Sequence, residues 1–209
     1  MVEAYQRRSA LAHFGLNALA TKGADGNVGI TVGEIAHRAI INIRGDASDG
    51  AFTAAIRNVT GVDLPNFANT VVTVGDIRIL WLGPDEWWIV ASDARRAELI
   101  DGLRRAFAGL HTNVTDVSES RTVIAMTGPA AREVLARGIS LDLHPRAFGP
   151  GQCAQTSLSK ANVLLHQTGT DPFSGAPSYE IYVLKSFSDY LWRWIGLIAE
   201  DFGLAVKAD

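Results

Sequence analysis

The sequence is poor in the residues from which metal and disulfide sites are built. It has one cysteine, Cys153, in 209 residues. A single cysteine excludes a disulfide within the chain and any zinc site made of paired cysteines. It also fits a reducing compartment, so we expect a cytoplasmic protein. The histidines are scattered, and none lies three or four residues from another, so a metal site would need convergence in the folded chain.

Motifs for nucleotides, hydrolysis and membranes are missing too. The chain has no GxGxxG, no phosphate-binding loop with its lysine and no Gly-x-Ser-x-Gly elbow. It has no run of about 20 apolar residues that would span a bilayer, and its polar first residues lack the apolar core of a secretion signal. We therefore expect no catalytic, cofactor-binding or metal-binding residue in this chain, and no membrane partner.

Positive charge is not in excess. Lysine and arginine total 19 against 22 acidic residues, which gives a net charge of −3. Nucleic-acid binding depends on clustered cations. The nearest cluster joins Arg95-Arg96 to Arg104-Arg105 on a predicted amphipathic helix, where a solvated polar face is the simpler interpretation. We expect no nucleic-acid partner.

What the sequence does contain is a core-forming composition, 47% hydrophobic and 20% charged, arranged in two similar halves. β-branched runs, hairpin signals and helical spacing predict the first series of elements, whose first helix would be capped by Asp46 or Ser48. These elements are a strand at 39–45, a helix at 51–57 that ends near Gly61, strands at 70–74, 77–82 and 87–90, and a helix at 94–108.

The same order returns about 80 residues later. It comprises a strand at 122–128, a helix at 130–136, strands at 153–158, 162–167 and 179–184, and a helix at 189–201. We predict an α+β fold of two strand-helix-strand-strand-strand-helix halves, 36–118 and 119–209, packed as one unit behind an N-terminal extension and loop, 1–35. The second half carries an extra loop at 168–178, and long loops often contact a partner.

Tryptophan gathers in two places. Trp81, Trp87 and Trp88 lie on predicted neighbouring strands, and Trp192 and Trp194 lie on the last helix. Adjacent strand residues point to opposite faces, so one helix-covered core does not bury Trp87 and Trp88 together. These five residues are candidates for a protein interface, where tryptophan is enriched. The alternative is that the second half of the chain covers them.

A charged cluster lies at the junction of the halves, formed by Asp116, Glu119 and Arg121. One interpretation is a site, or the relic of one, in which a carboxylate binds an amine or Arg121 binds a carboxylate. The other is structural: Asp116 and Ser118 tie the linker backbone by local hydrogen bonds, and Arg121 pairs with an acid.

Six segments of the sequence are distinctive: LGPDEWW at 82–88, DVSESRT at 116–122, GPAA at 128–131, LDLHP at 141–145, GQCAQT at 151–156 and KSFSDYLWRW at 185–194. In these segments the chain resembles the gamma subunit family of heterotetrameric sarcosine oxidase. The resemblance implies the folate-binding fold of glycine-cleavage T-protein, which the duplicated pattern fits.

The resemblance also implies a function, as a non-catalytic part of an oxidoreductase that acts on a CH–NH bond with oxygen as acceptor. Such a complex demethylates sarcosine to glycine and yields hydrogen peroxide with formaldehyde or methylenetetrahydrofolate. Its alpha, beta and delta subunits would hold NAD, FAD, FMN, zinc and tetrahydrofolate, and the isolated gamma chain would be inactive. Three alternatives stay open: a folate-dependent one-carbon transferase using Asp116, a stand-alone folate-binding module, and an unrelated scaffold.

Overall fold

The computed structural model describes residues 7–16 and 28–207, so the predicted N-terminal loop lies partly outside the described residues. The chain forms two compact units. The first unit comprises Met1–Ala36, Arg121–Pro150 and Gln155–Asp209, and the second comprises His37–Ser120 with Gly151–Ala154. The boundaries at 35 and 118 stay a prediction. Among the helices of the described residues, none is long and apolar enough to cross a bilayer.

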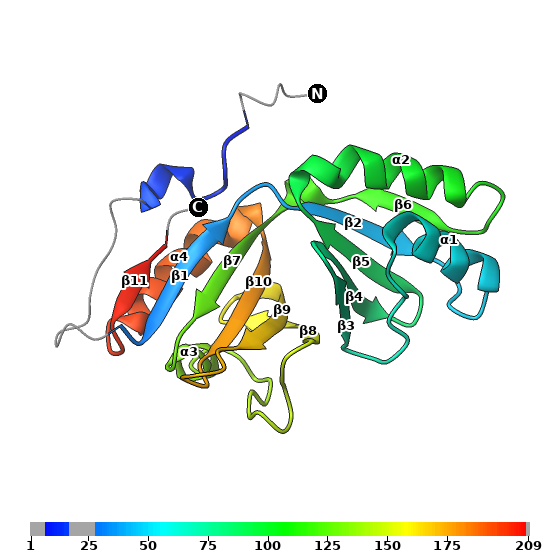
Figure 1. Ribbon diagram of the computed structural model, residues 1–209. Helices are drawn as coiled ribbons and strands as arrows, with labels where there is room; N and C mark the ends of the chain where they lie inside the picture. Colours follow the sequence, from blue (N-terminus) through cyan, green and yellow to red (C-terminus); the bar gives the residue numbers. More distant parts are fainter. Residues whose placement is uncertain (1–6, 17–27, 208–209) are drawn as a thin grey trace. The chain divides into compact units, whose positions relative to one another are not determined.

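The second unit is a five-stranded antiparallel sheet with two helices (Figure 1). Its strand order is β3-β4-β5-β2-β6. The strands are β2 (Ala39–Arg44), β3 (Val71–Val74), β4 (Ile77–Gly83), β5 (Glu86–Ala91) and β6 (Asn113–Asp116). The helices are α1 (Gly50–Thr60) and α2 (Arg96–Ala106), with 3-10 turns at Asp93–Arg95 and Ser118–Ser120.

Local hydrogen bonds set the limits of α1. Asp49 is its N-cap, and its carboxylate accepts a hydrogen bond from the Ala51 amide at 2.8 Å. The helix ends at Gly61, as predicted, and Gly61 has the left-handed conformation. The predicted N-cap, Asp46 or Ser48, was wrong and lies three residues or one before the observed cap. The Asp46 carboxylate instead accepts hydrogen bonds from the amide and hydroxyl of Ser48.

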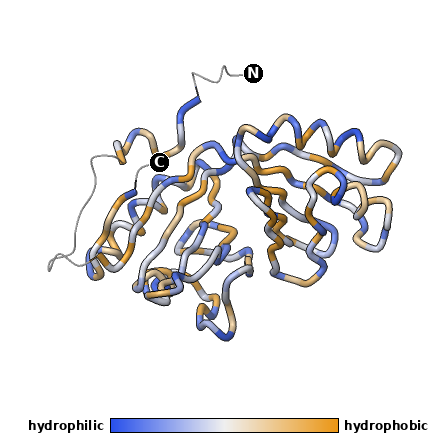
Figure 2. The backbone as a smooth tube through the Cα atoms, in the orientation of Figure 1, coloured by the Kyte–Doolittle hydropathy of each residue, from blue (hydrophilic) through white to orange (hydrophobic). Residues whose placement is uncertain are grey.

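Alternate strand residues of the second unit build its core. Ile41, Ile43, Trp87 and Ile89 pack in one cluster with side chains of both helices. Phe52 of α1 is fully buried, with its ring centroid 5.9 Å from that of Trp87 and 5.2 Å from that of Phe107. The hydropathy colouring shows the same pattern, with long hydrophobic stretches along the strands of this sheet (Figure 2).

The first unit is a six-stranded sheet in the order β11-β1-β7-β10-β9-β8. Strand β1 pairs parallel with β11 and antiparallel with β7, and β10 pairs antiparallel with β7 and β9. The strands are β1 (Ile30–Ile35), β7 (Arg121–Thr127), β8 (Gln152–Leu158), β9 (Ala161–Thr170), β10 (Pro177–Leu184) and β11 (Leu204–Val206). The helices are α3 (Ala131–Ala136) and α4 (Lys185–Ala199), with a 3-10 turn at Ala12–Phe14.

The predicted duplication is confirmed by element order and by sheet order. The series β2-α1-β3-β4-β5-α2 is repeated by β7-α3-β8-β9-β10-α4. In space, β3-β4-β5-β2 corresponds to β8-β9-β10-β7. The α+β class and the repeated strand-helix-strand-strand-strand-helix halves therefore describe the fold.

Strands β1, β6 and β11 were not predicted from the sequence. Strand β1 pairs with β7 in the position that β6 holds beside β2. Gly29, just before β1, lies very close to Gly128, just after β7. A Cβ added to Gly128 would lie 2.3 Å from the Gly29 carbonyl oxygen. Gly128 also has φ of 144°, which disfavours any other residue there.

We predict that Phe52→Ala lowers the free energy of unfolding by about 3–5 kcal/mol, since it leaves a cavity between two aromatic rings. The matched control is Phe67→Ala in the same unit, whose side chain is 75% exposed. That variant should change stability by less than about 0.5 kcal/mol. Denaturant unfolding of both variants gives the measurement, and equal effects would contradict the described core.

Candidate functional site

Two acids of the predicted charged cluster meet at the guanidinium group of Arg96. Arg96 begins α2 and Asp116 ends β6. Nε and Nη2 of Arg96 donate to Oδ2 of Asp116 at 2.8 and 2.7 Å, and Nη1 donates to Oε1 of Glu119 at 2.7 Å. Such a forked contact fixes both distance and orientation, so it clamps the start of α2 to β6.

Ser118 occupies the other oxygen of Asp116. Oδ1 accepts hydrogen bonds from the Ser118 amide at 3.1 Å and from its hydroxyl at 2.6 Å. The Ser118 hydroxyl oxygen in turn accepts from the Ile40 amide of β2 at 2.9 Å. Both carboxylate oxygens of Asp116 are therefore held by neighbouring groups, and the cluster links β2, β6 and α2.

The electrostatics of Asp116 favour a permanent charge. Burial raises the pKa of its carboxyl group, but the hydrogen bonds from Ser118 and Arg96 outweigh burial and the pKa lies below its ordinary value. A carboxyl group that is ionised throughout the neutral range holds no proton to donate as a general acid. This geometry supports the structural interpretation of the cluster.

The third predicted member, Arg121, begins β7 in the other unit, where its strand partner is Leu184. Arg96 was not predicted as a member of the cluster, because its position beside Arg95 indicated a solvated face. The side chain of Arg96 is only 23% exposed, whereas Arg104 and Arg105 are exposed as expected. Recognising β6 as a strand would have helped to find Arg96, because the pairing of β6 with β2 fixes the place of Asp116, opposite Ile41.

The tryptophans of the predicted interface divide by burial. Trp87, Trp88 and Trp192 are buried, and Trp81 and Trp194 are partly exposed. The Trp87 indole donates to the Pro65 carbonyl oxygen at 2.9 Å. Trp194 lies against Gly138, where an added Cβ would come within 2.5 Å of its ring. A partner surface at the five tryptophans stays a prediction, and it would reach Trp81 and Trp194 first.

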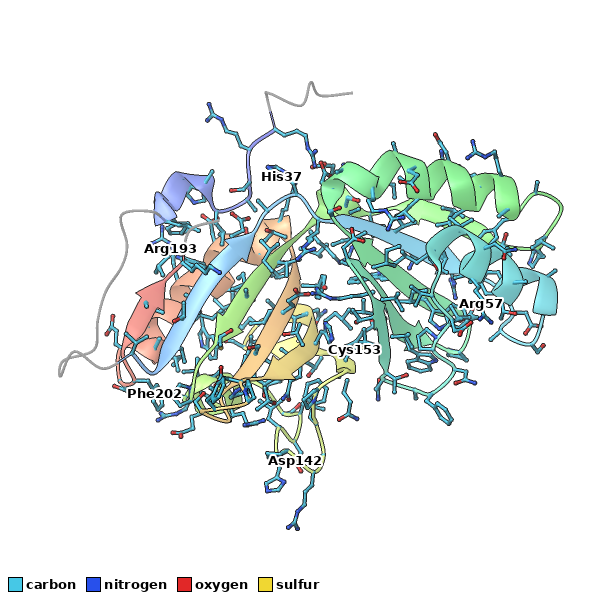
Figure 3. All side chains as sticks on the ribbon, viewed as in Figure 1. His37, Arg57, Asp142, Cys153, Arg193 and Phe202 are labelled. Atoms are coloured by element: carbon cyan, nitrogen blue, oxygen red, sulfur yellow. The ribbon has the colours of Figure 1, made fainter. Side chains whose placement is uncertain are left out.

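Cys153 lies near the start of β8 and is labelled in Figure 3. Its Sγ is 3.4 Å from the Trp81 carbonyl oxygen and 3.7 Å from that of Thr70. Burial raises the pKa of the thiol to about 12, against a smaller lowering by the Trp81 contact. Because the thiolate is the reactive form, this cysteine is suited to packing and unsuited to nucleophilic chemistry.

The histidines do not converge on one site. His13 contacts Asp189 at 2.9 Å on the surface of the first unit, and the ring nitrogen Nδ1 of His144 accepts from the Arg146 amide. His166 is buried on β9, with Nδ1 at 3.9 Å from Oε2 of Glu180. Within residues 7–16 and 28–207, no group of three His, Cys, Asp or Glu side chains is placed to hold a metal ion.

Known structures share this duplicated architecture. The glycine cleavage system aminomethyltransferase T from Bartonella henselae superposes with a TM-score of 0.63 at 15% identity, over 95% of this chain and 58% of that one. At this identity the likeness shows the fold alone. The class of fold defined by the two sheets is thus the one found in aminomethyltransferase T.

Sequence and structure together identify the family. A model of the "Sarcosine oxidase, gamma subunit family" matches residues 44–200. The sarcosine oxidase subunit gamma of Corynebacterium sp. (strain U-96) is 33% identical over 100% of this chain and 98% of its own length. That of Arthrobacter sp. is 35% identical over 90% and 88%. This chain belongs to the sarcosine oxidase gamma subunit family.

A solved structure agrees with this assignment. A chain of the heterotetrameric sarcosine oxidase from Corynebacterium sp. U-96, in complex with pyrrole 2-carboxylate, superposes with a TM-score of 0.81. The two chains are 32% identical, and the match covers 94% of this chain and 96% of that one. The predicted family resemblance is confirmed.

We predict that Asp116→Asn lowers the free energy of unfolding at pH 7 by about 1–3 kcal/mol, because it removes a hydrogen-bonded charge from the Arg96 clamp. Since the pKa of Asp116 is lowered in the folded state, its contribution is present above the ordinary carboxyl pKa of about 3.9 and is lost as pH falls through the folded value. The deficit of the variant should therefore shrink in acid.

Chemical denaturation at pH 7 and near pH 3 measures this deficit. Glu119→Gln is the control, because the Glu119 side chain is half exposed and such pairs contribute less than about 1 kcal/mol. A deficit of equal size at both pH values would contradict the assigned role of the Asp116 charge.

We predict that Cys153 reacts at least about 100-fold more slowly with iodoacetamide in the folded chain than in guanidinium, at pH 8. The reason is its raised pKa and its burial. The chain has one cysteine, so mass spectrometry of the whole protein reports this residue alone. Rapid labelling of the folded chain would show that the thiol is accessible.

Proposed function

We propose that this chain is the gamma subunit of a heterotetrameric sarcosine oxidase and that it supports the enzyme without supplying a catalytic residue. The observation that carries the proposal is the near full-length match to sarcosine oxidase gamma subunits, in sequence and in fold. The hydrogen bonds of Asp116, the best candidate for a catalytic acid, support the proposal too, since neighbouring groups bind both of its carboxylate oxygens.

The reaction of the complex would be the oxidative demethylation of sarcosine to glycine. Hydrogen peroxide is the second product, with formaldehyde or methylenetetrahydrofolate as the one-carbon product. On this proposal alpha, beta and delta subunits hold FAD, FMN, NAD, zinc and tetrahydrofolate, and the complex is cytoplasmic. The part played by this chain is to cover apolar surface of a neighbouring subunit and to stabilise the assembly by binding it.

The aminomethyltransferase-like fold raises the alternative of a chain that binds folate by itself. The fold that supports that alternative is shared at 15% identity. A fold does not carry a function without its site, so we place the subunit role first and use folate binding as a contrasting result.

We predict that the tagged chain, purified from its native host, brings down a yellow complex of four different chains that produces peroxide with sarcosine. Deleting its gene should lower the yield and the melting temperature of the remaining subunits. The measurements are a visible spectrum, a peroxide assay and a thermal melt.

A colourless single chain that retains tetrahydrofolate would contradict the subunit role and favour the folate-binding alternative. Unchanged assembly, activity and melting temperature after deletion would contradict the supporting role.

A further inference from the structure

The loop between β9 and β10, residues 171–176, is closed by its own hydrogen bonds. Oδ1 of Asp171 accepts from the amides of Phe173 and Ser174, at 3.1 and 2.7 Å, and from the Ser174 hydroxyl at 2.8 Å. The Asp171 carbonyl oxygen accepts from the Gly175 amide, and the Asp171 amide donates to the Ala176 carbonyl oxygen at 2.8 Å. The Asp171 carboxylate and two backbone hydrogen bonds together close the turn.

The base of this loop is packed and its tip is not. Ala176 and Pro177, where the chain enters β10, are buried. Phe173, at the tip, is 97% exposed, more than any other large hydrophobic side chain in the part of the chain that the structure describes. An aromatic ring this exposed contributes almost nothing to the core of its own unit.

A fixed loop that presents an exposed aromatic ring has the features of an interface anchor. Hydrogen bonds already shape the loop in the isolated chain, so binding has less to order, and that lowers the entropic cost of docking. Aromatic side chains are enriched in the buried centres of interfaces, where a few residues supply most of the affinity.

The composition of the loop defines the surface that would receive it. Asp171 is the only charged residue in 168–178, and three hydrogen bonds converge on one of its oxygens. The tip consists of Pro172 and Phe173 with small neighbours, so a charged pocket would gain no ion pair from it. With one ring and no lysine or arginine, the tip also lacks what a membrane-surface segment needs.

We propose that Phe173 is the anchor with which this chain docks into an apolar, uncharged pocket on another subunit of the oxidase complex. The inference rests on the proposed function, because the complex supplies the receiving subunit. The gamma subunit of Corynebacterium sp. (strain U-96), matched over 98% of its length, comes from the strain whose sarcosine oxidase is heterotetrameric. A heterotetramer favours a different subunit as the partner over a second copy of this chain.

The test compares full-length tagged wild type, Phe173→Ala and Phe67→Ala, each expressed with the other subunits in a host that lacks the native gene. Complexes are captured through the tag, and the loss of the other chains is followed over time in buffer. Phe173→Ala should release them roughly 10- to 100-fold faster. Phe67→Ala removes an exposed ring from the other unit and should behave as wild type.

A second variant tests the loop without touching the ring. Asp171→Ala removes the three hydrogen bonds to the Asp171 carboxylate and leaves the two backbone bonds, so it should also speed release, by less than Phe173→Ala. Because Phe173 is exposed, the isolated Phe173→Ala chain should melt within about 1 °C of wild type. A fall of several degrees would overturn the proposal, since the ring would then serve folding.

The remaining outcomes separate this inference from the proposed function. Equal release rates for wild type and Phe173→Ala would overturn the anchor and leave the subunit role intact. Loss of self-association by the isolated variant, seen in sedimentation velocity, would assign the loop to a second copy and overturn the choice of partner. A wild-type chain that captures no other subunit would overturn both.

Discussion

Pairing of β1 with β7 is the constraint on which the first unit depends. Glu34 lies in this pairing with its side chain buried, and its carboxylate accepts from the Thr122 hydroxyl at 2.6 Å and from the Leu11 amide at 3.2 Å. A buried carboxylate is costly unless hydrogen bonds replace its water. The bond to Leu11 fastens the segment around Leu11 to the sheet, and β7 pairs with β10, which pairs with β9 and follows the loop that presents Phe173.

Acidic side chains in both units hold structure together. Asp116 clamps α2 to β6, Glu34 fastens the N-terminal segment, and Asp171 closes a loop. Each of these carboxylates is already bound by groups of its own chain, so a substrate would have to compete with them. Under the proposed function, a chain of the gamma subunit family built this way would contribute surface and rigidity to the complex.

Much of the fold could be predicted because the repeated pattern is local. Strand alternation and the glycines at 61 and 75 identify α1 and the β3–β4 hairpin from a few neighbouring residues. Strands β1, β6 and β11 were not predicted because they pair with strands far away in the sequence, which periodicity does not reveal. Two residues of the predicted cluster, Asp116 and Glu119, meet at Arg96, which comes from a helix that begins 20 residues before Asp116 and meets it only in the folded chain.

The insertion of the second unit between β1 and β7 has a consequence for synthesis on the ribosome. All strands from β2 to β6 emerge consecutively, so their sheet is able to form while the rest of the chain is still being made. Strand β1 emerges earlier than any of them, yet its edges stay unpaired until β7 and β11 have followed. Unpaired strand edges can pair with the wrong strand. Strand β1 is therefore exposed to wrong pairing from the time it emerges until β7 and β11 have been made.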